Sequence, residues 1–567
     1  MKKKLAFVLA AVAPIAISAS RAADYDILIR GGTIYDGSGG EPFVGDVAMR
    51  GDKIVYVGHH APGRAARTVD ATGKAVSPGF VNMLAHPEES LIADGRGLSD
   101  VQQGVTLEVL GEDSMGPLTP AMKVRAVQRQ GDIKYPIRWT TLGQYLEYLQ
   151  RKGISPNIAS FVGAGTVRVN VLGERDVQPD ARQLAAMQGL VLQAMKEGAV
   201  GVTTALIYSP NTYARTPELI ALAKVSARCG GIYSAHMRSE GDRLEQAIGE
   251  TIEIAEASGG PAEIYHFKQA GRDNWGKFDK AVAMIEAARA RGVRITADMY
   301  VYTAGATGLD AAMPSWAQDG GLEKWIARLK DPATRARVAG EMRDAHPKTW
   351  ENLYAGAGPE GTILLAFKNP KLKPLTGKTL AEVAKMRGKS PEETAMDLVV
   401  EDGSRVGVAY FLMSEDNVRK GLRLPWMSFD SDEAAPAPEG VFLLSNNHPR
   451  AYGNFARLLG RYVRDEKQVS LAEAVRRLSS FPASNLSLRN RGSLKPGYYG
   501  DVVVFDPATI TDHSTFDKPH QLATGVDDVF INGVQVLKDG KHTGAKPGRF
   551  VRGPGWTGWP GGGACRR

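Results

Sequence analysis

The sequence predicts an α/β protein whose two ends form a smaller β-rich part. Residues 79–486 alternate apolar strand patterns with helix patterns, which is typical of parallel α/β folds. Residues 24–78 and 487–552 contain short strands separated by glycine turns. The two ends can form one small sandwich if the chain returns to its start after the middle domain. Within the middle, His236 and His266 each end a strand candidate, and α/β barrels keep their chemistry at such strand ends.

Length and composition are those of an ordinary soluble globular protein. The chain has 567 residues, enough for a large core and one or two accessory domains. Hydrophobic residues make up 43% and charged residues 23%, and the formal net charge is +8. No helix candidate gathers the basic residues into a stripe, so we expect no nucleic-acid partner.

The first residues, 1–23, are typical of a secretory signal peptide. Met1–Lys4 is basic, and residues 5–17 form an apolar run that is followed by small residues. About a dozen apolar residues are too few to span a bilayer comfortably, so we expect cleavage between Arg21 and Asp24 and no stable membrane anchor. The mature protein is then exported, to the periplasm or out of the cell.

The middle region supplies the strands and helices of the α/β part. The sequence predicts a helix that starts at Thr216, because Thr216 offers an N-cap and Pro217 and Glu218 suit the first turn. The strand candidates, besides the two that end in histidine, are residues 105–111, 199–208, 293–300 and 424–432.

Two further segments depart from this alternation of strands and helices. Residues 308–423 read as an insertion that covers the barrel mouth, and residues 553–567 as a flexible Gly/Trp/Pro tail without a core pattern. The two cysteines, Cys229 and Cys565, lie at the end of a core helix and in this tail, so we expect no structural disulfide.

The two histidine strands and the helix between them form a βαβ unit. Such a unit places both strands parallel, so the two imidazoles converge on one rim. Either histidine alone is better explained as a buried residue bonded to backbone, but the pair favours metal ligation. A catalytic zinc site needs a third protein ligand, and the carboxylate candidates at other strand ends are Glu112, Asp113 and Asp432. Each of these carboxylates could instead cap a helix.

The motifs resemble those of the N-acyl-D-amino-acid deacylases (D-aminoacylases) of the amidohydrolase superfamily, over nearly the whole mature chain. The resemblance implies a distorted (β/α)8 TIM barrel, a β-sandwich built from both ends, and amide hydrolysis by zinc-activated water. It also implies that His236 and His266 are zinc ligands and that Asp432 is the general base and then the acid. The segments that carry it include AHMRSEGDRLEQAI, YHFKQAG, SPGFVNMLAH, QGVTLEVLGEDSMGP, ADMYVYTAG, HPRAYGNFARLLGRYV and GSLKPGYYGDVVVFDP.

Two positions depart from the family pattern. The family has His-x-His after the first barrel strand, whereas this chain has Leu84 at the first position and keeps only His86. The family's cysteine after the second strand is absent, and Glu112 or Asp113 can replace it because zinc accepts oxygen ligands. We prefer Glu112, which is nearer the strand end, and expect one zinc ion, with a second as the alternative. His86 is then a pocket residue or a core histidine.

A substrate with a free carboxylate needs cations and hydrogen-bond donors. We expect Lys268 and Arg450 to bind the carboxylate, and Tyr208 and Tyr302 to donate hydrogen bonds. The competing interpretations are solvated or paired charges for the cations and wall packing for the tyrosines.

The expected substrate is a small-molecule N-acyl-D-amino acid or related peptide. The reduced metal cluster leaves open a D-dipeptidase, lactamase or lactonase on the same scaffold. The loss of two family ligands leaves open a catalytically retired binding protein. The sequence does not settle whether the chain forms a homo-oligomer.

Overall fold

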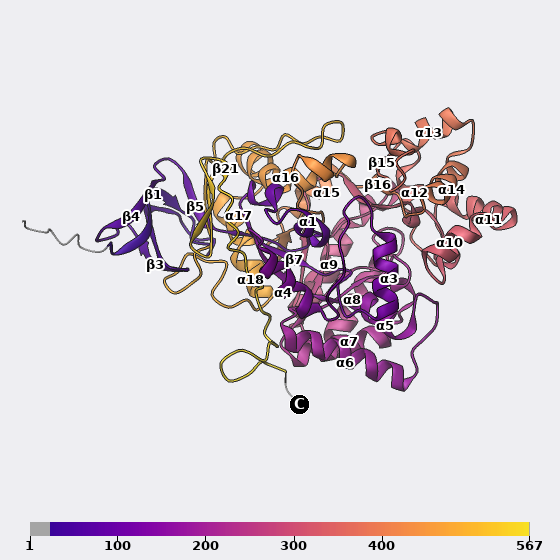
Figure 1. Cartoon of the computed structure of the whole chain (residues 1–567), viewed down its shortest axis with the longest axis horizontal. Coiled ribbons are helices and arrows are strands. Elements are labelled where there is room, and N and C mark those ends of the chain that lie inside the picture. Colours follow the sequence, from indigo (N-terminus) through magenta and orange to yellow (C-terminus); the bar gives the residue numbers. More distant parts are fainter. Residues whose placement is uncertain (1–22, 566–567) are drawn as a thin grey trace, which may run out of the picture.

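The centre of the computed structural model, which describes residues 23–565, is a closed barrel of parallel strands (Figure 1). Hydrogen bonds join six strands in the order β17-β13-β12-β11-β10-β9 and three in the order β6-β7-β8. Segments β8 and β9 are separated only by Phe161 and occupy one strand position, and the Met83 amide donates to the Phe429 carbonyl at 3.2 Å to close the circle. The fold is therefore the predicted (β/α)8 barrel. Its strands are β6 (Phe80–Asn82), β7 (Val105–Leu110), β8 (Asn157–Ser160), β9 (Val162–Gly163), β10 (Gly201–Ala205), β11 (Ile232–His236), β12 (Ala262–Ile264), β13 (Ile295–Met299) and β17 (Met427–Phe429).

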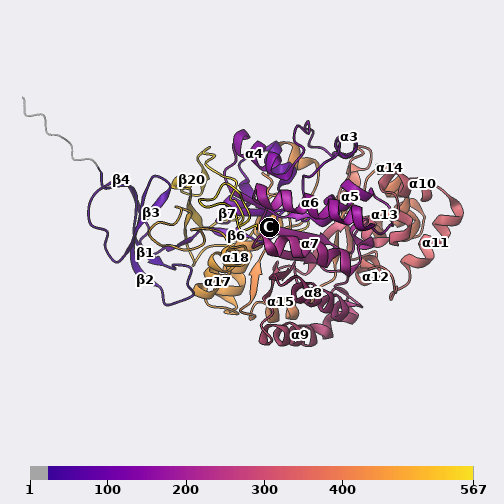
Figure 2. The ribbon, with the colours of Figure 1, turned by 90° about the horizontal axis from the view of Figure 1, so that it is seen from below.

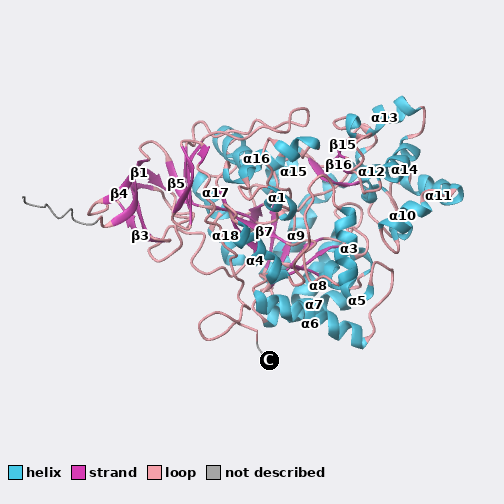
Figure 3. Cartoon of the chain, in the orientation of Figure 1, coloured by secondary structure: helices cyan, strands magenta, loops and turns pink. Residues whose placement is uncertain are grey.

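Helices surround these strands, as Figure 3 shows. Seen from below, α6 to α9 lie along the outside of the barrel in chain order (Figure 2). Their buried faces share one large apolar cluster with the strands. No helix within residues 23–565 has the length and apolar character that crossing a membrane requires. The helices around the barrel are α1 (Glu88–Ala93), α2 (Leu98–Val101), α3 (Pro120–Arg129), α4 (Leu142–Lys152), α5 (Ala164–Leu172), α6 (Ala181–Glu197), α7 (Thr216–Arg228), α8 (Leu244–Ser258), α9 (Phe278–Ala290), α15 (Glu415–Gly421), α16 (Arg450–Arg457), α17 (Leu471–Leu478) and α18 (Ser480–Asn485).

The predicted start of α7 differs in one respect. Thr216 lies inside the helix rather than at the N-cap, which is Arg215 and makes no side-chain capping bond. The Thr216 hydroxyl donates instead to the Glu250 carboxylate at 2.9 Å, because the neighbouring α8 offers a stronger acceptor.

Both ends of the chain contribute to one nine-stranded sheet at the left of Figure 1. Strand β5 joins them, since it pairs with β1 in parallel and with β18 in antiparallel orientation, where Ser77 lies opposite Val503. Side chains from both ends fill a common apolar cluster that includes Ile29, Val47 and Phe530. The strands are β1 (Tyr25–Ile34), β2 (Phe43–Arg50), β3 (Lys53–Gly58), β4 (Ala65–Asp70), β5 (Ala75–Pro78), β18 (Val502–Phe505), β19 (Val526–Ile531), β20 (Val534–Lys538) and β21 (Lys541–His542).

Between β13 and β17 the chain builds a subdomain on the opposite side of the barrel, at the right of Figure 1. It has its own apolar cluster, separate from that of the barrel. Three antiparallel strands pair within it in the order β14-β16-β15. The elements are β14 (Ala304–Gly308), α10 (Leu322–Arg328), α11 (Pro332–Met342), α12 (Leu353–Ala357), β15 (Thr362–Ala366), α13 (Leu380–Arg387), α14 (Pro391–Asp402) and β16 (Gly407–Phe411).

The C-terminal tail corrects two expectations. Cys565 is disulfide-bonded to Cys229 at the end of α7, although the sequence indicated no structural disulfide. The tail, which we expected to be flexible, also contacts the barrel. The Gly553 amide donates to the Gly198 carbonyl at 2.8 Å, and the Thr557 amide donates to the Lys196 carbonyl at 3.1 Å. These contacts use backbone groups, so they leave no periodic apolar pattern in the sequence. The predicted signal peptide lies outside the described residues, apart from Ala23.

The disulfide should stabilise the folded chain. We expect Cys565→Ser to remove about 2–4 kcal/mol of cross-link stabilisation and so lower the midpoint of thermal unfolding. Reductant should lower the wild-type midpoint towards that of the variant and leave the variant unchanged. An equal effect of reductant on both proteins would show that the cross-link contributes nothing.

Candidate metal centre

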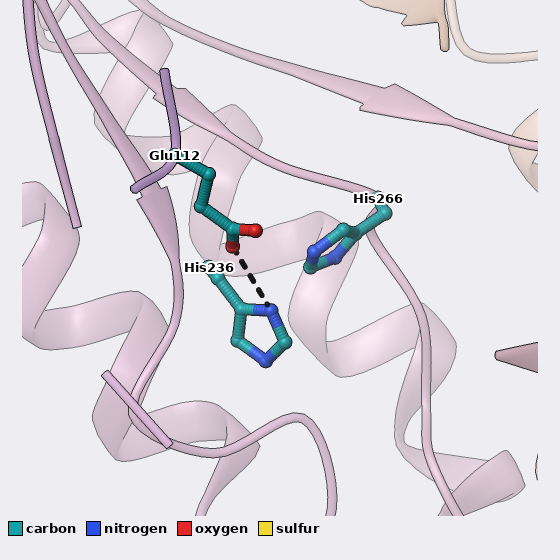
Figure 4. A group of neighbouring side chains, drawn as sticks. All are labelled: Glu112, His236 and His266. Carbon is teal, nitrogen blue, oxygen red and sulfur yellow. Dashed lines mark ion pairs between the residues drawn. The ribbon is translucent and has the colours of Figure 1, made fainter. Parts of the chain in front are cut away.

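Three barrel strands bring Glu112, His236 and His266 together at one rim (Figure 4). Glu112 follows β7, His236 ends β11 and His266 follows β12. The Nδ1 atom of His236 lies 3.4 Å from the Glu112 Oε1 atom, and the two imidazole centroids are 4.4 Å apart. One possible ligand atom from each residue lies within 4.8 Å of the others. This is the convergence that the βαβ unit predicts.

The donor atoms of this group fit a metal ion. All three side chains are buried, yet the His236 Nε2 and Glu112 Oε1 atoms have no hydrogen-bond partner within residues 23–565. Buried polar atoms are rarely left without partners, because losing water without compensation is costly. Two imidazoles and one carboxylate are the ligands of a well-known class of catalytic zinc sites.

The backbone at this rim is strained at two of the predicted site residues. His266 and Asp432 have φ angles of +36° and +48°, a region that non-glycine residues seldom occupy. Hydrogen bonds hold both peptides in place: His266 N donates to the Asp298 carboxylate, and Asp432 N to the Leu84 carbonyl at 2.9 Å. Such strain costs on the order of 1–3 kcal/mol per residue and persists where the surroundings impose it.

Asp432 lies between a histidine and an arginine. Its Oδ1 atom is 3.1 Å from His86 Nε2, and its Oδ2 atom is 2.9 Å from Arg450 Nη2. Burial acts to raise the pKa of Asp432, but Arg450 and the imidazoles of His266 and His86 lower it well below its usual range. The carboxylate is therefore ionised at neutral pH.

His86 belongs to this site and not to the apolar core. Its Nε2 atom also lies 3.5 Å from Glu112 Oε2, so His86, Glu112 and Asp432 form a second group of potential ligands. Burial acts to lower the pKa of His86, but the Asp432 hydrogen bond and the Glu112 charge raise it to about 10. Leu84, in contrast, is fully buried among apolar side chains.

Lys268 lines the same cavity as the candidate metal ligands, but its positive charge is already paired. Its Nζ atom lies 2.6 Å from Glu240 Oε1 and 2.7 Å from His266 Nδ1. Burial opposes the charge on both partners, yet their mutual attraction raises the pKa of Lys268 and lowers that of Glu240. Sequence reasoning missed Glu240, although its position four residues after His236 was a usable signal.

Arg450 and Tyr302 are placed differently from the prediction. Arg450 is 1% exposed and donates to both the carboxylate and the backbone carbonyl of Asp432, so it lies behind the base and not on the cavity wall. The Tyr302 hydroxyl lies 3.4 Å from Asp512 Oδ2, and Tyr302 does not line the cavity that the candidate metal ligands line. Tyr300 lines the cavity in its place.

These residues surround a cavity of about 320 Å³. Tyr208 lines it, with its ring centroid 5.1 Å from that of His236, and its hydrogen bond to a substrate stays a prediction. Asp113 lines the same cavity, where desolvation by the surrounding walls and the Glu112 charge raise its pKa. Arg405, from the inserted subdomain, completes the wall; nothing in its sequence surroundings indicated a role there.

Comparisons with known proteins agree with this architecture. Residues 67–537 match the model of the amidohydrolase family. A D-aminoacylase from Alcaligenes xylosoxydans xylosoxydans is 32% identical over 94% of this chain and 99% of its own length. A D-aminoacylase structure, described as having a binuclear metal centre with one-metal activation and second-metal attenuation, superposes with a TM-score of 0.78. It is 31% identical, over 93% of this chain and all of the other.

A second solved structure that is similar to this chain contains zinc. An N-acyl-D-glutamate deacylase from Bordetella bronchiseptica, complexed with zinc and a phosphonate mimic of the tetrahedral intermediate, has a TM-score of 0.76 and 27% identity. It covers 93% of this chain and 99% of its own. The barrel, the histidine and carboxylate group and these full-length similarities together show that the chain belongs to the amidohydrolase family of metal-dependent amide hydrolases.

Proposed function

We propose that this protein hydrolyses the amide bond of N-acyl-D-amino acids with one zinc ion bound to Glu112, His236 and His266. The observation that carries the proposal is the convergence of these buried side chains, in which His236 Nε2 and Glu112 Oε1 have no hydrogen-bond partner within residues 23–565. The substrate class is supported by the names of the full-length relatives, which act on N-acyl-D-amino acids.

The residues of the chain have separate tasks in this reaction. A zinc ion in this site would lower the pKa of water and polarise the acyl carbonyl. Asp432 is ionised, so it accepts the proton of the attacking water and returns it to the nitrogen of the departing amine. Arg450 fixes the position of Asp432 through two hydrogen-bonding contacts and keeps it charged.

The arrangement of charged side chains at this rim favours one bound metal ion over two. The second group of potential ligands shares Glu112 with the first, and its His86 is ion-paired with Asp432. A second cation there would have to compete with His86 for the Glu112 and Asp432 carboxylates. The missing ligand at Leu84 weakens that second position further.

We further propose that the protein is exported. Support comes from the Cys229–Cys565 disulfide, since such bonds persist mainly in oxidising compartments. The basic and apolar first residues are in keeping with the same proposal.

Metal content tests the ligand set. We expect about one zinc ion per wild-type chain and a loss of most of it in Glu112→Ala, because a tetrahedral site with two protein ligands binds weakly. Elemental analysis of purified protein measures this, with Glu256→Ala on the exposed face of α8 as the control. Two ions in the wild type, or full zinc content in Glu112→Ala, would contradict the proposed site.

Turnover tests the reaction. The wild type should hydrolyse N-acetyl-D-amino acids but not the L-enantiomers, as measured by release of the free amino acid. Asp432→Asn should retain zinc and lose about 100- to 10,000-fold in kcat, the usual contribution of a general base. Asp416→Asn, at a surface position on α15, is the matched control. A zinc-loaded wild type without activity on any N-acyl-D-amino acid would overturn the proposed function.

A further inference from the structure

The inserted subdomain contacts the loop that follows strand β11 and its histidine. This loop, residues 237–243, connects His236 to helix α8. Glu351 of the subdomain lies between α11 and α12, is buried, and directs its carboxylate at the loop. Its Oε1 atom accepts a hydrogen bond from the Glu240 amide at 2.9 Å, and its Oε2 atom accepts one from the Ser239 hydroxyl at 2.6 Å. Glu351 therefore holds the loop through both carboxylate oxygens.

Glu240 is the residue of this loop that reaches the metal centre. Its side chain is 2% exposed, and its Oε1 atom lies 2.9 Å from the His266 Nδ1 atom. The Ala270 amide donates to the Glu240 carbonyl at 2.8 Å. The Glu240 backbone is therefore held on both sides, by Glu351 at its amide and by the segment after β12 at its carbonyl.

A carboxylate at the Nδ1 atom of a metal-binding histidine has a defined effect. When Nδ1 donates its hydrogen to the carboxylate, Nε2 keeps the lone pair that a metal needs, and the ring is held in one orientation. The Glu240 Oε1 atom also accepts a hydrogen bond from the Lys268 ammonium at 2.6 Å, which favours the charged form of the carboxylate. The position of Glu240 thus determines how well His266 is oriented for a zinc ion.

We propose that Glu351 is a positioning residue through which the inserted subdomain sets the zinc affinity of the metal centre. Glu351 fixes the position of Glu240, and Glu240 orients His266. This inference rests on the zinc site of the proposed function and extends it to a residue that does not line the metal pocket. A change in how the subdomain packs at this point would alter zinc affinity without altering any ligand.

Two neighbouring contacts join the same segments without involving Glu240. The His346 Nδ1 atom lies 2.8 Å from the Asp242 carboxylate, and the Arg243 Nη1 group donates to the Lys348 carbonyl at 3.0 Å. The His346 side chain is 64% exposed, so this ion pair lies at the surface. Removing it perturbs the packing of the subdomain on the loop but leaves the bond between Glu351 and the Glu240 amide.

Zinc affinity tests the role of Glu351. Glu351→Ala should weaken zinc binding about 10- to 100-fold, measured by competition with a chelator, because the Glu240 amide and the Ser239 hydroxyl lose their acceptor. Glu351→Gln keeps a carbonyl acceptor and should bind zinc nearly as tightly as the wild type. His346→Ala is the matched control, because it removes only the surface contact to Asp242, and should keep wild-type affinity. Wild-type affinity in Glu351→Ala, or an equal loss in His346→Ala, would overturn the positioning role.

A double-mutant cycle tests whether Glu351 acts through Glu240. Glu240→Gln alone should weaken zinc binding, since it removes the carboxylate at His266 Nδ1. Glu351→Ala added to Glu240→Gln should then change zinc affinity far less than it does in the wild-type background. The same factor in both backgrounds would show that Glu351 affects the metal centre independently of Glu240, which contradicts the proposal.

A shorter carboxylate serves if Glu351→Ala does not fold, as judged by circular dichroism. Glu351→Asp withdraws the carboxylate by one methylene group and keeps its charge. We expect it to lose zinc affinity, and to lose none in the Glu240→Gln background, because the bond to the Glu240 amide is stretched or broken. Unchanged zinc affinity in folded Glu351→Asp would overturn the positioning role.

Failure of this inference is distinct from failure of the proposed function. A wild type that binds no zinc overturns both. A zinc-loaded wild type without activity on N-acyl-D-amino acids, together with the expected losses of affinity, overturns the proposed substrate and supports the role of Glu351. An active wild type, with variants at Glu351 that keep wild-type zinc affinity, retains the proposed function and overturns only the positioning role.

Discussion

Pairing between buried cations and carboxylates determines which acids at the barrel mouth are ionised. Asp430 and Asp432 lie two residues apart after β17; Asp430 is fully buried, whereas Asp432 is partly buried and lines the cavity. Burial and the neighbouring Asp432 charge raise the pKa of Asp430 well above its usual range. Asp432, which Arg450 contacts directly, has a lowered pKa. Arg450 and the neighbouring imidazoles thus favour the ionised form of Asp432, whereas burial and the charge of Asp432 disfavour ionisation of Asp430.

The same principle applies to the two cations that follow the family motifs. Lys268 pairs with Glu240 and Arg450 with Asp432, so removing either cation would leave its carboxylate without an ammonium or guanidinium partner. Arg405 also lines the cavity, and it comes from outside the barrel. Arg405 belongs to the inserted subdomain, whose apolar cluster is separate from that of the barrel.

The sequence predicted the parts of this protein that follow from periodicity and from strand ends. The barrel, the rim position of His236 and His266, and the approach of Glu112 to them all come from parallel strands that end on one side. Side-chain direction beyond a strand end was not predictable: Tyr300 lines the cavity and Tyr302 does not, although both follow β13. Contacts between distant segments, such as Cys229 with Cys565 or Arg405 with the metal pocket, leave no local signal at all.

The position of β5 in the shared sheet makes the protein sensitive to incomplete synthesis. Strand β5 has β1 on one side and β18 on the other, and β18 belongs to the last part of the chain to be made. A product that stops before Val502 would leave β5 with an open row of amide and carbonyl groups next to an uncovered apolar cluster. Open edges of this kind pair with other chains. Truncation at the C-terminal end would therefore yield an aggregating fragment and not a smaller working barrel, even though every metal ligand would still be present.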